Sequence, residues 1–191
     1  MAKSNRSGQA AIFTPEQLSQ LWVELDPPYR LVTQICYFTA ARCGEVVSLE
    51  RSDLQRNRIV YRSAKTKTKV TRESVISQQL RELLQKSALP NQGYLFPSGG
   101  RSGHLTVRAV DKHVRAAAAL IGVEGASTHS FRRSMATHLH LNGVPLRAIQ
   151  RITGHATLAA LERYLDVIGR EAAEQQQSVL DALFPKASSA A

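Results

Sequence analysis

The spacing of apolar residues along the chain predicts a mostly helical protein. Thr14-Pro15-Glu16-Gln17 is typical of a helix start, with Thr14 as the N-cap, Pro15 at the first helical position and Gln17 closing a capping box. Apolar residues then recur at helical intervals through most of the chain. We expect helices over residues 15–25, 29–41, 44–49, 77–86, 106–121, 130–141 and 145–153, another from residue 157, and a last one over 172–183.

A short β segment interrupts these helices. Ile59-Val60-Tyr61 and Val75-Ile76 carry the β-branched and aromatic residues of strands, and residues 64–71 between them form a ribbon with a basic tip. The fold class is therefore mostly α with a small antiparallel β-sheet (α+β). We expect a loose basic tail over residues 1–13, one domain over residues 14–184, and a second tail over residues 185–191.

Composition excludes several classes of protein. The chain has 191 residues, of which 43% are hydrophobic and 21% charged, which is typical of a globular domain. No apolar run approaches the roughly 18 residues of a membrane helix, and the N-terminus lacks the apolar core of a secretory signal. Cys36 and Cys43 are too few for a four-ligand zinc site, so we expect reduced thiols in a cytoplasmic protein without metal or cofactor.

Net charge indicates the kind of partner. The 25 basic and 15 acidic residues give a net charge of +10, and the excess is concentrated. Residues 56–72 contain seven basic residues and no acid, and residues 125–161 also contain no acid. A compact domain of this charge favours a polyanion, with nucleic acid ahead of an anionic membrane surface because no single basic amphipathic helix carries the charge.

Four groups of residues are candidates for chemistry on a phosphate. Arg42 lies between apolar segments, where a buried charge needs a partner, and Glu45 is three residues away. The helical spacing of His129 and Arg132 places them on one face near a helix start. The other two groups are His155 with Tyr164, which a break at Gly154 can bring to one site, and the alternating Lys65, Lys67 and Lys69 of the ribbon. Each group alone also fits an ordinary structural role.

Together these groups resemble the catalytic domain of the tyrosine recombinase (phage integrase) family, from about residue 14 to residue 183. The family motifs are T-G-L-R-x-x-E, a lysine in a β-hairpin, H-x-x-R, and L-G-H followed nine residues later by tyrosine. In order, this chain has Ala40-Ala41-Arg42-Cys43-Gly44-Glu45, the lysine ribbon, His129-Ser130-Phe131-Arg132, Thr153-Gly154-His155 and Tyr164. The order and spacings match those of the family.

The resemblance implies a role for each matched residue. Tyr164 would attack the scissile phosphate and form a 3′-phosphotyrosyl link, leaving a free 5′-hydroxyl. Arg42 and Arg132 would stabilise the charge of the transition state, and Glu45 would brace Arg42. His129 and His155 would hydrogen-bond the phosphate or help to move the nucleophile's proton. The leaving oxygen would be protonated by Lys67, with Lys65 as the alternative because hairpin length varies in the family.

Two departures from the family pattern bear on function. Ala40 and Ala41 replace the motif's glycine and leucine with small apolar residues. Family members usually carry an N-terminal core-binding domain that grips the other face of DNA, and we expect none in this chain. Binding to double-stranded DNA would then be weak and steeply salt-dependent, and activity would need self-association or a partner recombinase.

Three other functions remain open. A DNA-binding regulator with this fold would need no chemistry, although every nucleophile and clamp position is filled. A helix-turn-helix repressor matches residues 145–164 loosely but leaves Arg42 and the lysines unexplained. A type IB topoisomerase-like nickase shares the chemistry and differs in its products. The favoured function is a site-specific recombinase that acts in the cytoplasm at the nucleoid.

Overall fold

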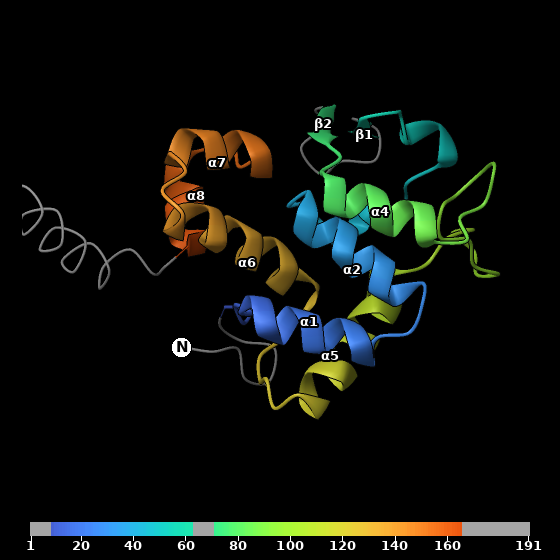
Figure 1. Ribbon diagram of the computed structural model, residues 1–191, viewed down its shortest axis with the longest axis horizontal. Helices are drawn as coiled ribbons and strands as arrows, with labels where there is room; N and C mark the ends of the chain where they lie inside the picture. Colours follow the sequence, from blue (N-terminus) through green and yellow to red (C-terminus); the bar gives the residue numbers. More distant parts are fainter. Residues whose placement is uncertain (1–8, 63–70, 166–191) are drawn as a thin grey trace, which may run out of the picture.

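The computed structural model describes residues 9–62 and 71–165 (Figure 1). This part is mostly helical with an antiparallel pair of strands, which confirms the expected α+β fold class. The expected hairpin tip with Lys65 and Lys67, and the expected helix over 172–183, lie outside the described residues. In chain order the elements are α1 (Pro15–Glu24), α2 (Tyr29–Phe38), α3 (Cys43–Val47), η1 (Arg51–Asp53), β1 (Arg58–Tyr61), β2 (Arg72–Val75), α4 (Gln78–Lys86), α5 (Val107–Leu120), α6 (Thr128–Leu141), α7 (Leu146–Thr153) and α8 (Leu158–Leu165).

Helix ends follow the capping residues of the sequence. The hydroxyl of Thr14 accepts a hydrogen bond from the backbone N–H of Gln17, and the Gln17 side chain accepts one from the Thr14 N–H, so the expected capping box is present. The hydroxyls of Ser77 and Thr106 cap α4 and α5 by accepting the backbone N–H groups of Leu80 and Ala109. Gly154 ends α7 with a φ of 68°, a left-handed conformation that glycine adopts without strain.

Several boundaries differ from the expected ones, and three of the shifts have a visible cause. Helix α6 begins at Thr128, two residues early, because the Ser130 hydroxyl accepts the backbone N–H of Ser127 and moves the cap to that position. Helix α2 ends at Phe38, before residue 41, because the chain turns at Ala40 with a φ of 49°. Strand β2 spans Arg72–Val75, since it pairs in register with the whole of β1.

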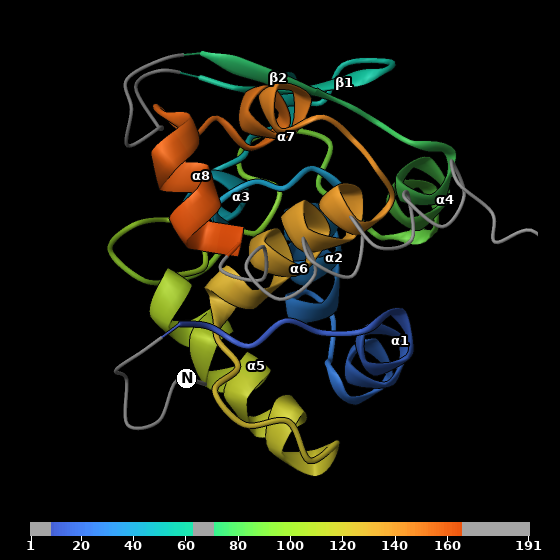
Figure 2. The same ribbon diagram turned by 90° about the vertical axis from the view of Figure 1, so that its left-hand side faces the viewer.

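Two apolar cores hold the helices. The larger core is formed by side chains from helices α1, α2, α3, α4, α5 and α6 and from strand β1. It buries side chains such as Leu18, Ile35, Ile59 and Val114. The smaller core consists of Ala136, Ile149, Leu161 and Leu165 and joins α6, α7 and α8. In Figure 1 these three helices lie on one side of the molecule, and the sheet with α4 lies on the other. Figure 2 shows α7 next to the sheet.

Residues 9–13 pack against the domain, unlike the tail that we expected over residues 1–13. The Phe13 side chain is fully buried, and its ring centroid lies 5.5 Å from that of Phe131 on α6. The Phe13 backbone N–H donates to the Ser134 hydroxyl at 2.8 Å. The apolar segment Ala10-Ala11-Ile12-Phe13 is too short to show a helical period, so its burial has no signal in the apolar pattern.

The longest helices of the described residues, α5 and α6, have 14 residues each. None of the helices within residues 9–62 and 71–165 is long and apolar enough to cross a membrane, for which about 20 residues are needed. Cys36 and Cys43 are both buried free thiols.

Ala40 combines a left-handed backbone with complete burial, which predicts how it responds to substitution. We expect Ala40→Val to lower the free energy of unfolding by about 2–4 kcal/mol, because a β-branched residue is strained at positive φ and overpacks the core. Ala40→Gly should stay within about 1 kcal/mol of wild type, because relief of strain offsets the lost methyl. Urea unfolding measures both variants, and equal losses in the two would contradict the role of the backbone.

Candidate active site

The structure brings five of the sequence-predicted residues together where α3, α6, α7 and α8 meet. The Tyr164 hydroxyl donates to the backbone carbonyl of His129 at 3.2 Å. The ring centroids of His155 and Tyr164 are 4.9 Å apart. Arg42 and Arg132 are close enough to each other and to His155 for their charges to interact. Lys67 and its alternative Lys65 lie outside the described residues.

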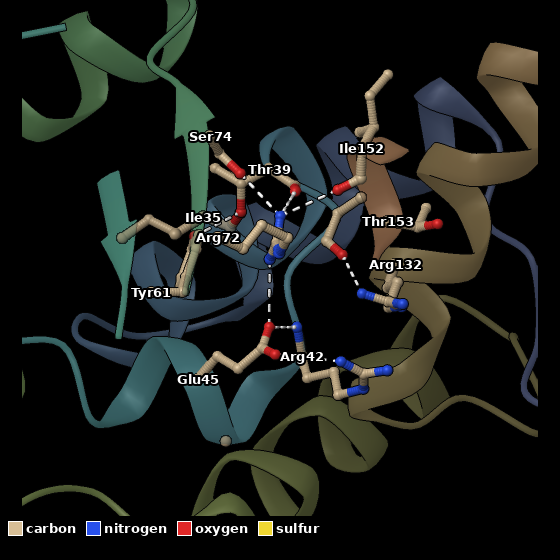
Figure 3. A network of polar contacts seen from close by, with 12 residues as sticks. Ile35, Thr39, Arg42, Glu45, Tyr61, Arg72, Ser74, Arg132, Ile152 and Thr153 are labelled. Carbon is tan, nitrogen blue, oxygen red and sulfur yellow. Dashed lines mark hydrogen bonds and ion pairs between the residues drawn. The ribbon is translucent and has the colours of Figure 1, made fainter. Parts of the chain in front are cut away.

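A buried carboxylate organises the arginines of this site (Figure 3). Glu45, only 4% exposed, lies on α3 and caps it by accepting the backbone N–H of Arg42 at 2.9 Å. Its other oxygen accepts from the Arg42 guanidinium at 3.1 Å, which confirms the expected pair. Arg72 on β2 donates to Glu45 at 3.2 Å. One carboxylate therefore positions two guanidinium groups from different parts of the chain.

The charge of Glu45 depends on these partners. Burial favours the protonated acid, but the hydrogen bond from the Arg42 backbone and the charges of Arg72, Arg42 and Arg132 outweigh it. The pKa of Glu45 is therefore lower than its ordinary value. Because the pair is buried, loss of either partner would leave an uncompensated charge.

Arg132 on α6 is 2% exposed and has an unusual environment for a guanidinium. Its Nη1 donates to the Ala40 carbonyl at 2.7 Å. Its Nη2 is buried and has no hydrogen-bond partner within residues 9–62 and 71–165. Burial, together with the nearby charge of Arg42, lowers the pKa of Arg132 to about 10, so the group is still charged at neutral pH. The site thus contains a buried cation with an unused donor.

Arg72 is a site residue that the sequence analysis did not single out. Its side chain is 14% exposed and its Nη1 donates to the Ile152 carbonyl of α7 at 3.0 Å and to the Ser74 hydroxyl at 2.9 Å (Figure 3). Its guanidinium carbon also lies 4.5 Å from the centre of the Tyr61 ring. A Cβ at Gly154 would lie 3.2 Å from Arg72 Cδ, so glycine permits this close approach. Arg72 thus connects β2, α3 and α7.

Arg133, the second residue that the sequence analysis missed, holds the helix that carries Tyr164. Its Nε donates to the backbone carbonyl of Tyr164 at 3.0 Å, and its Nη1 donates to that of Ala10 at 2.6 Å. Burial raises the pKa of Tyr164 to about 12, against the opposing charges of Arg132, Arg133 and Arg42. The hydroxyl of Tyr164 is therefore protonated in the absence of a ligand.

His155 is placed by the turn that follows α7. The left-handed Gly154 ends the helix, as the sequence analysis expected, and the ring of His155 comes to face Tyr164. Its Nδ1 lies 2.7 Å from the hydroxyl of the buried Thr153. Burial and the charges of Arg132 and Arg42 lower the pKa of His155 to about 4, so the ring is neutral at pH 7.

This arrangement suits a phosphodiester. Two guanidinium groups and a phenolic hydroxyl converge, and a phosphate between Arg42 and Arg132 would use the free donor of Arg132. Among the residues that the structure describes, no three His, Cys, Asp or Glu side chains are grouped to bind a metal ion. The groups present are donors for an anion and a nucleophile.

Comparison with known proteins connects this geometry to one family. The model of the phage integrase family matches residues 12–170. A relative named tyrosine recombinase XerD, from Rhizobium meliloti, is 32% identical over 143 residues, covering 71% of this chain and 46% of the relative. The integrase of Escherichia phage P2 is 28% identical over 150 residues, covering 78% of this chain and 41% of that protein. The chain thus spans about half the length of these curated relatives.

Solved structures show the same fold. The catalytic domain of bacteriophage HP1 integrase superposes with a TM-score of 0.63 and 26% identity, covering 87% of this chain and 95% of that one. The XerA recombinase superposes with a TM-score of 0.68 and 21% identity, covering 90% and 66%. The arrangement of helices and strands is therefore that of tyrosine recombinase catalytic domains.

The depressed pKa of Glu45 predicts a loss of stability in acid. Its contribution is fully present above the ordinary carboxyl pKa of 4.5 and is lost as the pH falls through the lower folded-state pKa. We expect Glu45→Gln to lower the free energy of unfolding by about 3 kcal/mol at pH 7, because it breaks a buried ion pair, and by less at pH 3. Urea unfolding between pH 3 and pH 7 measures this difference.

The matched control is Glu24→Gln, which removes an exposed carboxylate at the end of α1. This variant should follow the wild-type pH dependence. A Glu45→Gln variant whose destabilisation is the same at pH 3 and pH 7 would contradict the assigned charge of Glu45.

Proposed function

The chain belongs to the phage integrase family, and we propose that it is a site-specific recombinase that cuts and rejoins duplex DNA through a phosphotyrosyl intermediate. The observation that carries this proposal is the buried guanidinium of Arg132. Its Nη2 has no partner within the described residues, although it lies beside Arg42 and the candidate nucleophile Tyr164. A buried charge with an unused donor is costly, and a bound phosphate would offset that cost.

In the cleavage step, the Oη of Tyr164 forms a bond to the scissile phosphorus and the bond from phosphorus to the 5′-oxygen breaks. The phenolic proton passes to a base, and the leaving 5′-oxygen takes a proton from an acid. Arg42 and Arg132 donate to the non-bridging oxygens, where negative charge increases in the transition state. The energy of the phosphodiester is kept in the protein–DNA bond, so attack by a 5′-hydroxyl reverses the step and joins strands.

We assign the acid to Lys67, with Lys65 as the alternative. The two lysines are two residues apart in the sequence between β1 and β2. Arg72 supports this assignment, because it connects the start of β2 to Glu45 and to α7. Both lysines precede Arg72 closely in the sequence, which supports a role at the same site.

Strand exchange requires cuts in two duplexes, so we propose that several copies, or copies of a related recombinase, assemble on double-stranded DNA. The net charge of +10 supports binding to the DNA backbone. Among similar proteins, the XerH site-specific recombinase has been crystallised bound to its difH substrate. A protein with this function would act at the nucleoid.

Tyr164→Phe should abolish covalent attachment to DNA while leaving binding close to wild type, because only one hydroxyl is removed. The measurement uses end-labelled, nicked duplexes from the neighbourhood of the protein's own gene, at low salt. Adducts are counted on a denaturing gel and binding on a native gel. The matched control is Tyr29→Phe, because that ring stacks on His113 of α5.

An adduct that persists in Tyr164→Phe would overturn the assignment of Tyr164 as the nucleophile.

In the same assay Arg132→Ala should slow attachment by about 100-fold or more, as for loss of an oxyanion donor. Arg115→Ala, which removes a partly exposed arginine of α5 that pairs with Asp111, should not slow it. Relaxed circles without exchanged strands would indicate a topoisomerase-like nickase instead.

A DNA substrate with a better leaving group can show which of the two lysines is the acid. Lys67→Ala should slow cleavage of ordinary DNA but not of DNA with sulfur in place of the scissile 5′-oxygen. A thiolate is a much better leaving group than an alkoxide, since thiol pKa values are near 8.5, so it departs without an acid. If the sulfur-containing DNA restores the cleavage rate of Lys65→Ala and not that of Lys67→Ala, the acid is Lys65.

A further inference from the structure

The hydroxyl of Thr153 lies directly against the ring of His155. Thr153 is the last residue of α7 and is fully buried. Its Oγ1 is 2.7 Å from His155 Nδ1 and 2.8 Å from the carbonyl oxygen of Ile149. Thr153 stands where the L-G-H motif has leucine, which has no hydroxyl to offer. The contact is therefore a property of this chain that the motif does not supply.

The number of available protons decides the direction of the hydrogen bonds among the Thr153 hydroxyl, His155 Nδ1 and the Ile149 carbonyl. If the Thr153 hydroxyl donates to the Ile149 carbonyl, its lone pair can accept the proton of His155 Nδ1, and two hydrogen bonds form. If the hydroxyl donates to Nδ1 instead, it has no proton for Ile149 and only one bond forms. Each hydrogen bond contributes about 1 kcal/mol in a buried setting, so the first arrangement is favoured. The proton of the neutral ring is then on Nδ1, and Nε2 keeps its lone pair.

We propose that Thr153 is a positioning residue that fixes His155 in the Nδ1–H form, so that Nε2 accepts the phenolic proton of Tyr164 during attack on DNA. This inference rests on the proposed function. In the step, the Oη–H bond breaks and the proton binds Nε2, while the electron pair on Oη forms the bond to phosphorus. The ring becomes an imidazolium without turning over, and its Nδ1 keeps the hydrogen bond to Thr153.

Substrate binding would increase the basicity of His155. After burial, the charges of Arg132 and Arg42 are the groups that lower its pKa. A phosphodiester held by these two arginines carries one negative charge, which offsets part of their positive charge and favours an imidazolium. Tyr164 on α8 is the other ionisable group that the ring faces. The base is therefore weak in the free protein and becomes effective when DNA is bound.

Thr153→Val tests the inference, because it removes the hydroxyl and keeps the shape of the side chain. Thr153→Ser is the matched control, because it keeps the hydroxyl. Nitrogen-15 NMR of histidine-labelled protein, without DNA, shows which ring nitrogen carries the proton, and the His155→Gln variant assigns the signal. We expect the Nδ1–H form in wild type and in Thr153→Ser, and a shift toward the Nε2–H form in Thr153→Val.

The second readout is the rate of covalent attachment to nicked DNA. A general base contributes about 10²–10⁴-fold, so a misplaced ring proton should slow attachment by about 10-fold to 100-fold in Thr153→Val. Thr153→Ser should restore most of the rate. Thermal unfolding of each variant separates this effect from a loss of folded protein.

Several outcomes would overturn the inference. An Nε2–H form in wild type, or an unchanged Nδ1–H form in Thr153→Val, removes the role of the hydroxyl. If Thr153→Val changes the tautomer of His155 but not the rate of covalent attachment, His155 is not the base. Equal slowing in Thr153→Ser and Thr153→Val shows a packing effect only. If wild type forms no adduct on any DNA, the proposed function fails, yet NMR still decides which nitrogen Thr153 holds.

Discussion

The buried carboxylate of Glu45 is the interaction on which the site depends. Three guanidinium groups crowd the junction of α3, β2 and α6, and without an anion they would repel one another. Glu45 compensates Arg42 and Arg72 directly, and its pKa is lowered by them in return. Arg132 forms no bond to Glu45, so the positive charge of the site remains in excess where a phosphate would bind.

Local signals predicted most of the fold. The helix caps at Thr14, Ser77 and Thr106 and the break at Gly154 are where the sequence indicates them, because a cap is decided by residues within one turn. Some boundaries moved by a few residues where the residue that ends the element gave no signal for it. The turn at Ala40 is an example, since alanine carries no signal for a positive φ.

The candidate site was predictable in part for the same reason. The pair of Arg42 and Glu45 follows from a spacing of three residues. Arg72 was missed because it lies in a basic run that resembles a solvated face, and its partner Ile152 is 80 residues away. Arg133 was missed because its acceptors, the carbonyls of Ala10 and Tyr164, belong to segments that meet only in the folded chain.

The two bonds of Arg133 also have a mechanical consequence. One guanidinium holds the carbonyl of Ala10 and the carbonyl of Tyr164, so the segment entering the domain and the helix bearing the phenol share a single anchor. Tension applied through the chain just ahead of Gln9, by a surface tether or a bulky fusion, would pass through that anchor to the tyrosine. In a force experiment, pulling on the chain ahead of Gln9 would therefore act on the helix that carries Tyr164.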